Sequence, residues 1–199
     1  MGLFEVGFNE VMQVEGGRSL DPDDRGNWTS GRIGVGILRG TKYGISAMSY
    51  PHLDIQKLTL DEAMAIYRCD YWDRLYLDQI GLHFPKVARM LFNLGVNCGN
   101  PNATKFLQNT INTLNIQEGV GLQPARLSTW QEKILRLLGG KALKVDGVLG
   151  TLTLSALMEI PHPHAVAVGV FGEAYKHYAK GKLKYRAGWL NRLGTLYLR

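Results

Sequence analysis

Apolar residues recur at three- and four-residue spacing through most of this chain, and this periodicity restricts the possible folds more than any other feature. It covers residues 3–14, 60–72, 86–96, 103–114, 127–138, 151–158 and 164–180, with glycine or proline in the gaps. Such spacing places each apolar set on one face of an α-helix. Residues 28–46, rich in glycine and β-branched residues, are expected to form a small hairpin or a glycine-supported loop. We therefore predict an all-α fold.

Composition narrows the class of protein further. A chain of 199 residues, 45% of them hydrophobic, can bury the core of one domain or two small ones. Cys69 and Cys98 form no disulfide framework, and five scattered histidines have no zinc spacing, so we expect neither a metal nor a cofactor. The N-terminus lacks the pattern of a secretory signal, and the longest apolar run, residues 165–172, is far shorter than the roughly 20 residues that span a bilayer. A soluble protein without stable membrane insertion is expected.

Charge divides the chain into two unlike parts. Residues 1–84 carry 8 Lys and Arg against 12 Asp and Glu, whereas residues 85–199 carry 15 against 5. A basic segment favours an anionic polymer or surface as its partner, although a solvated basic face explains it equally well. The densest basic cluster consists of Lys176, Lys180, Lys182, Lys184 and Arg186.

The first predicted helix directs attention to Glu15. Phe4, Phe8 and Val11 follow one another by four and three residues, and four more residues lead to Glu15, so this glutamate continues the apolar stripe. A carboxylic acid among apolar neighbours loses the hydration of its charged form and keeps its proton near neutral pH, as a general acid requires. The alternative is a helix-terminal glutamate whose side chain extends into solvent.

The acids that follow have a simpler explanation. The stretch SLDPDD, with Asp21, Asp23 and Asp24, has good turn chemistry and needs no catalytic role. It lacks the alternating acids, central glycine and distant glutamate of an EF-hand, which excludes that type of calcium site.

The stretches VEGGRSLDPDDRG and GTKYGIS together resemble glycoside hydrolase family 108, the lysozyme-type N-acetylmuramidases of phages and bacteria. The segment LTLDEAMAIYRCDYW is similar to the next part of the family pattern, so the resemblance spans about residues 4–75. It implies a lysozyme-like fold with Glu15 as the catalytic acid, Asp24 as the second carboxylate and Thr41 as the threonine that holds water or shapes the cleft. Arg18, in an aromatic position, and the additional residues between Gly26 and Thr41 depart from the pattern and make Thr29 a rival for Thr41.

The basic part resembles the helical peptidoglycan-binding domain that commonly follows this hydrolase domain, in LFNLGVNCGNPNATKFLQNTIN, KVDGVLGTLTLSAL and YRAGWLNRL. We therefore expect a catalytic domain at residues 1–84 and a wall-binding domain at 85–199, which could pack as one body. Asp146 and Gly147 are expected to form a turn, and Gly150 to clear a close approach. Trp189 is either a sugar-stacking or a core residue.

The resemblance implies a phage endolysin that hydrolyses the β-1,4 bond between N-acetylmuramic acid and N-acetylglucosamine in bacterial peptidoglycan. Inversion at the anomeric carbon is expected, because two well-separated carboxylates favour it. The resemblance further implies accumulation in the host cytoplasm until a holin-type protein opens the membrane.

Two alternatives to this hydrolase stay open. A lytic transglycosylase would need Glu15 and no Asp24, and a non-catalytic wall-binding module would need neither. Nucleic acid is not expected as a partner, because no recognition-helix or zinc-finger pattern is visible.

Overall fold

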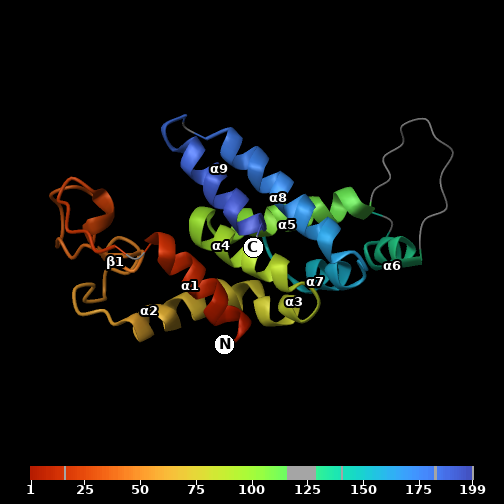
Figure 1. Ribbon diagram of the computed structural model, residues 1–199, viewed down its shortest axis with the longest axis horizontal. Coiled ribbons are helices and arrows are strands. Elements are labelled where there is room, and N and C mark those ends of the chain that lie inside the picture. Colours follow the sequence, from red (N-terminus) through yellow and green to blue (C-terminus); the bar gives the residue numbers. More distant parts are fainter. Residues whose placement is uncertain (16, 116–128, 140, 182, 199) are drawn as a thin grey trace. The chain divides into compact units, whose positions relative to one another are not determined.

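The computed structural model describes residues 1–15, 17–115, 129–139, 141–181 and 183–198 of the chain. Its elements are α1 (Leu3–Glu15), the 3-10 helix η1 (Arg25–Asn27), β1 (Thr41–Lys42), β2 (Ile45–Ser46), α2 (Leu60–Tyr67), the π-helix η2 (Arg68–Trp72), the 3-10 helix η3 (Asp73–Leu75), α3 (Leu77–His83), α4 (Pro85–Cys98), α5 (Asn100–Asn115), α6 (Thr129–Leu137), α7 (Thr151–Met158), α8 (Pro163–Ala179) and α9 (Leu183–Leu198). The predicted all-α class is confirmed (Figure 1).

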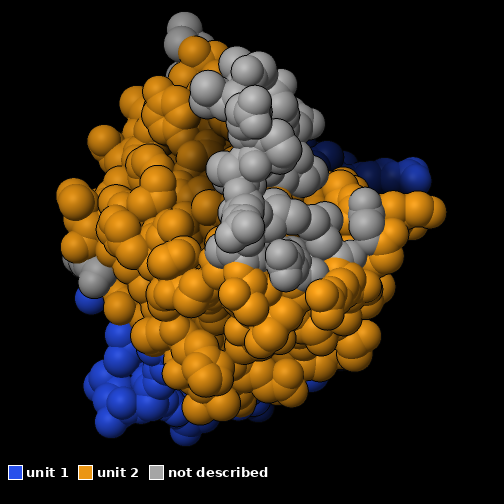
Figure 2. Space-filling view, turned by 90° about the vertical axis from the view of Figure 1, so that its right-hand side faces the viewer, with its two compact units in different colours: residues 1–70 blue, residues 71–199 orange. Residues whose placement is uncertain are grey.

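The chain divides into two compact units, Met1–Asp70 and Tyr71–Arg199 (Figure 2). Within unit 2, α3 (Leu77–His83) packs on α4, and the expected boundary between a catalytic and a wall-binding domain after residue 84 stays a prediction. No helix of the described residues combines the length and the hydropathy needed to cross a membrane.

In unit 1, a ring contact joins α1 and α2. Phe4, Phe8 and Val11 are buried, so the predicted apolar stripe of α1 is confirmed. The ring of Phe8 meets the ring of Tyr67 edge-on, with centroids 5.6 Å apart. The hydroxyl of Tyr67 donates to the carbonyl of Tyr43 at 3.0 Å, which ties α2 to the turn between β1 and β2.

The start of α2 follows its predicted cap. The hydroxyl of Thr59 accepts from the amide of Glu62 at 3.2 Å, and the Glu62 carboxylate accepts from the Thr59 amide at 2.7 Å. This reciprocal capping box satisfies two backbone donors that the first turn leaves open. The donors of Thr59 lower the pKa of Glu62, because they stabilise its charged form.

The small sheet of unit 1 is a tight antiparallel hairpin. Thr41 pairs with Ser46 and Lys42 with Ile45, which leaves Tyr43 and Gly44 as the two loop residues. Both have positive φ, 53° and 75°, as a type I′ turn requires. The hairpin expected within residues 28–46 is therefore confirmed at its C-terminal end.

Unit 2 surrounds α4, which is buried on most of its circumference. Helices α3, α5 and α8 pack against it, and α9 packs against α8 (Figure 1). Helices α3 and α9 were not predicted from the periodicity of the sequence. Helix α3 has only seven residues, and α9 contains two glycines, Gly188 and Gly194, that weaken its pattern. The 60–72 pattern also changes from α-helix to π-helix at Arg68.

The segment after residue 139 is attached to α5 by amide side chains. Asn112 exchanges two hydrogen bonds of 2.8 Å with the backbone of Leu143. Gln108 donates to the Asp146 carboxylate at 3.0 Å and accepts from the amide of Gly147 at 3.0 Å. The bond from Gln108, followed by one from the amide of Val148, lowers the pKa of Asp146. The predicted turn at Asp146 and Gly147 is present.

The prediction that Gly150 clears a close approach is wrong, because Gly147 has that role. Gly147 has a φ of +79°, and a Cβ there would lie 2.9 Å from the carbonyl oxygen of Pro101. A Cβ on Gly150 would meet nothing within 4 Å. Gly150 instead caps the start of α7 at Thr151.

We therefore expect Gly147→Ser to lower the free energy of unfolding by about 1–3 kcal/mol, because serine is strained at positive φ and its Cβ meets backbone. The matched variant Gly150→Ser should change it by about 0.5 kcal/mol or less, since serine is a good N-cap residue. Urea unfolding of both variants measures this, and an equal loss in the two would contradict the assignment.

Candidate active site

Glu15 is the last residue of α1, directly after the buried stripe that ends at Val11. Its side chain lies outside the described part of the chain, so its inward orientation stays a prediction. Four residues later the chain is anchored again, where Ser19 and Thr41 exchange two backbone hydrogen bonds of 2.9 and 2.8 Å. This pairing places Thr41 beside the segment that leaves the helix.

Asn27 holds the loop between Ser19 and Thr41 together, and sequence analysis missed it. Its side chain is fully buried. Nδ2 donates to the Ser19 hydroxyl at 3.1 Å and to the carbonyl of Asp21 at 2.9 Å. Its backbone carbonyl accepts from the amides of residues 39 and 40, both at 3.0 Å. One buried residue therefore joins three separate parts of the loop.

The hydroxyl of Thr41 completes this network, and the geometry fixes the direction of its hydrogen bond. The carbonyl of Asp21 can only accept, so the amide nitrogen of Asn27 must face it, and Oδ1 of Asn27 then faces Thr41. The Thr41 hydroxyl consequently donates to Oδ1, at 2.8 Å. Its proton is used, but its oxygen can still accept from a water molecule or a sugar hydroxyl.

Thr29, the rival of Thr41, belongs to a different part of the loop. Its Oγ1 accepts from the amide of Ile37 at 3.0 Å, and no bond in the described residues joins its side chain to Asn27. A Cβ on Gly36 would lie 2.6 Å from this hydroxyl. The side chain of Thr29 thus closes the loop of residues 29–37.

Asp24 is exposed and caps η1. Its Oδ1 accepts from the amide of Gly26 at 2.8 Å, which orients the carboxylate. Among the described residues, Oδ2 has no hydrogen-bond partner. Asp21 has a purely local bond, since its Oδ1 accepts from the amide of Asp23 at 2.9 Å. Asp24 therefore has an oriented carboxylate with one oxygen, Oδ2, that can still accept a hydrogen bond. Its role as the N-cap of η1 would by itself also explain why an aspartate occurs at this position.

Gly40 permits the close approach on which this arrangement depends. Its φ is +84°, and a Cβ there would collide with the carbonyl oxygen of Ser19. On the other side of the hairpin, Arg39 donates to the carbonyls of Pro51 and Leu53, both at 2.9 Å. Residues 39 and 40, at the C-terminal end of the loop, thus contact both the segment at Ser19 and the segment at residues 51–53.

The described residues give little support for a metal site or for a nucleophilic cysteine. No group of three or more His, Cys, Asp and Glu there could hold a metal ion. Burial raises the pKa of Cys98 to about 11, and its thiol donates to the carbonyl of Leu94 at 3.1 Å. A neutral thiol of this kind is a poor nucleophile.

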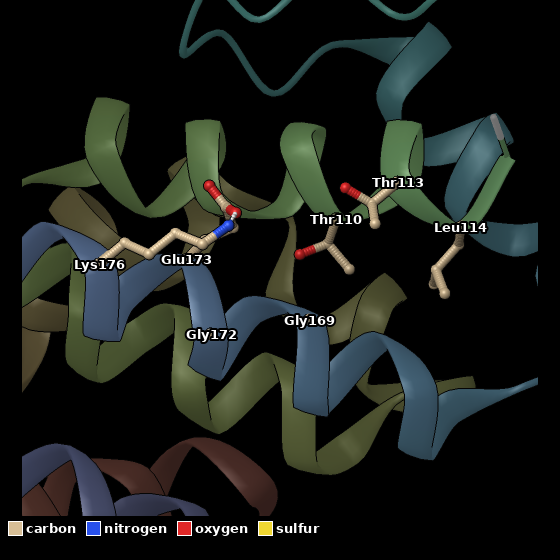
Figure 3. A pocket seen from close by; sticks show the side chains of 7 residues that line it. All are labelled: Thr110, Thr113, Leu114, Gly169, Gly172, Glu173 and Lys176. Atoms are coloured by element: carbon tan, nitrogen blue, oxygen red, sulfur yellow. Dashed lines mark hydrogen bonds and ion pairs between the residues drawn. The ribbon is translucent and has the colours of Figure 1, made fainter. Parts of the chain in front are cut away.

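Unit 2 contains a shallow pocket of about 160 Å³ between α5 and α8 (Figure 3). Gly169 and Gly172 form one side of it, and Thr110, Thr113 and Leu114 line the other. The Glu173 carboxylate at its end is already paired, with Lys176 at 2.7 Å and with Asn109 at 3.0 Å. The pocket therefore offers no unpaired charge to a ligand.

The predicted wall-binding residues are only partly described. Trp189 packs against the ring of Tyr178, with centroids 5.7 Å apart, and a Cβ on Gly181 would lie 2.5 Å from it. It therefore packs within unit 2, but it is half-buried, and its role as a core or a sugar-stacking residue stays open. Lys176 is paired with Glu173, whereas the side chains of Lys182 and Lys184 lie outside the described part. The wall-binding role stays a prediction.

If Asn27 holds the loop, Asn27→Ala should lower the free energy of unfolding by about 2–4 kcal/mol, because it leaves several buried polar groups without partners. Asn27→Asp should be at least as harmful, since a carboxylate cannot donate to the carbonyl of Asp21. The exposed Asn9→Ala is the control. Urea unfolding and proteolysis within residues 19–41 report the effect, and parity between Asn27→Ala and Asn9→Ala would disprove it.

Comparisons with known proteins support the fold and the general class of reaction. A solved structure of SagA from Brucella abortus is similar over 98% of this chain and 92% of that chain, with a TM-score of 0.64 and 19% sequence identity. At this identity the likeness shows a shared fold. A comparison with curated proteins found no match. Residues 8–99, which include Glu15, Asp24 and Thr41, match the model of the family Glycosyl hydrolase 108, and this match supports a peptidoglycan-cleaving glycoside hydrolase.

Proposed function

We propose that this protein is an N-acetylmuramidase, which hydrolyses the β-1,4 bond between N-acetylmuramic acid and N-acetylglucosamine in bacterial peptidoglycan. The observation that carries the proposal is the family match over residues 8–99, because this segment contains the residues of the candidate site. The proposal assigns chemistry to three side chains and needs no metal or cofactor.

Glu15 is the proposed general acid. It follows the buried residues Phe8 and Val11 by two turns and one turn of α1, respectively. Apolar surroundings favour the protonated form of a carboxylic acid, which can then protonate the leaving oxygen of the glycosidic bond. Donation of this proton lets the bond break without expelling an alkoxide.

Asp24 is the proposed general base. The hydrogen bond from the amide of Gly26 to Oδ1 fixes the carboxylate, and Oδ2 can accept a proton from water. The Thr41 oxygen, whose proton is donated to Asn27, can accept the second hydrogen of the same water. Two acceptors would then orient one lone pair of the water for attack.

This division of roles implies inversion. Asp24 lies nine residues beyond Glu15, across a Gly-Gly exit and a proline turn, so the two carboxylates belong to different structural elements. A separation of about 6.5–9.5 Å leaves room for water and favours direct displacement, whereas about 5–5.5 Å favours a covalent intermediate and retention.

The roles predict a pattern of variants. Glu15→Gln and Asp24→Asn should each reduce the rate of peptidoglycan solubilisation by roughly 10²–10⁴-fold, because an amide neither donates the required proton nor accepts one from water. Asp21→Asn and Asp23→Asn should stay within about threefold, because an amide at position 21 keeps the oxygen that accepts from the backbone of residue 23. Thermal unfolding serves as the control for folding. Activity of Glu15→Gln above a few per cent of the parent rate would place the acid elsewhere.

The products separate this proposal from other reactions. Mass spectrometry of digested peptidoglycan should find muramic acid at the reducing ends. A 1,6-anhydro product would establish a transglycosylase, and the absence of any product would indicate a binding module. NMR of the first anomeric proton released from a wall fragment should show the α-anomer, and a β-anomer appearing first would exclude Asp24 as a base opposite the acid.

A further inference from the structure

The loop after Trp28 exposes an unusual amount of apolar surface. The side chains of Ile33, Val35 and Ile37 are 56%, 50% and 56% exposed and occupy every second position. We call these three residues the apolar tip. Single exposed aliphatic side chains are common on proteins, whereas three of them within five residues of one loop are unusual and suggest an interaction site.

Hydrogen bonds inside the loop hold the apolar tip in this exposed arrangement. The Ser30 hydroxyl donates to the carbonyl of Val35 at 2.7 Å and accepts from the amide of Arg32 at 3.1 Å. Thr29 and Ile37 bond through the Thr29 amide and hydroxyl, both at 3.0 Å. The hydroxyl groups of Ser30 and Thr29 thus bond to the backbone of the loop itself, while the aliphatic side chains remain exposed.

The glycines between these residues take up the backbone conformations that the aliphatic residues would not tolerate. Gly34 and Gly36 have φ values of +74° and +83°, which β-branched residues rarely adopt. A Cβ on Gly34 would meet nothing within 4 Å, so no packing within the loop requires its absence. The alternation presents isoleucine and valine in relaxed backbone conformations at the surface.

The loop that carries the apolar tip contains basic residues, while three exposed aspartates, Asp21, Asp23 and Asp24, directly precede it. Residues 25–53 contain Arg25, Arg32, Arg39 and Lys42 and no aspartate or glutamate. Arg39 and Lys42 bind backbone carbonyls, whereas Arg25 and Arg32 are exposed. Arg32 is the charged residue next to the apolar tip in the sequence, so a partner with negative charge beside an apolar layer would complement this surface.

We propose that the apolar tip docks on the surface of an anionic phospholipid membrane, with the aliphatic side chains among the acyl chains and Arg25 and Arg32 at the headgroups. Interfacial binding of this kind combines a small apolar area with basic residues. The apolar tip contains no aromatic ring to stack on a sugar, and two copies meeting tip to tip would oppose their arginines. This docking is independent of the proposed hydrolase activity.

The test is co-sedimentation of the full chain with vesicles of phosphatidylglycerol or of phosphatidylcholine. We expect partition onto phosphatidylglycerol, weaker partition onto phosphatidylcholine, and an at least tenfold loss in the variant Ile33→Ser, Val35→Ser, Ile37→Ser. The matched control is Leu82→Ser, Val148→Ser, Leu152→Ser, which removes three aliphatic side chains of unit 2 that are 79%, 66% and 53% exposed. It should bind within twofold of the parent chain. Arg32→Gln should weaken binding to phosphatidylglycerol alone.

Several outcomes would overturn the proposal. The parent chain could remain in the supernatant with both lipids, or the two triple variants could lose binding equally. A tenfold loss of activity on lipid-free wall in the tip variant, at an unchanged melting temperature, would assign the apolar tip to the substrate cleft. Light scattering that shows a dimer of the parent and a monomer of the tip variant would make it a self-association surface. Vesicle binding needs no catalysis, so this test decides the docking proposal even if the protein has no hydrolase activity.

Discussion

The buried amide of Asn27 is the interaction on which the candidate active site depends. An irregular loop cannot satisfy its own backbone groups, and the segment from Ser19 to Thr41 forms almost no regular structure. Asn27 donates three hydrogen bonds to this segment and accepts others at two oxygens, from a position without solvent contact. The side chain of Asn27 takes the proton of the Thr41 hydroxyl, and its backbone amide donates to the carbonyl of Asp24, three residues earlier.

The same device appears in unit 2. Helix α5 contains many polar residues, yet Gln108 is buried and Asn112 faces the segment that runs from Leu143 to Val148. These amides bind the backbone of a glycine-containing turn and hold it against the helix. In both units, therefore, helices supply the apolar core and a buried amide fastens the irregular segment to it. A buried amide is suited to this task because it both donates and accepts.

The loop of residues 28–40 joins two proposals that rest on different observations. Its two ends, at Asn27 and Gly40, belong to the site that the family match supports. Its middle exposes Ile33, Val35 and Ile37, which contribute nothing to the core. These exposed residues lie between Gly26 and Thr41, the stretch that the sequence alone marks as a departure from the family pattern. A hydrolase held at a membrane would act on the wall layer nearest to it.

The sequence by itself determined the helical class, the apolar stripe that leads to Glu15 and the capping box of Thr59 and Glu62, because periodicity and caps depend on residues three or four positions apart. It also pointed to Asp24 and Thr41, but only through resemblance. Tertiary structure decided the rest. Asn27 binds partners 8 and 14 residues away, and Gly147 is required by Pro101, 46 positions earlier. Such contacts have no local pattern, since they exist only after the chain has folded.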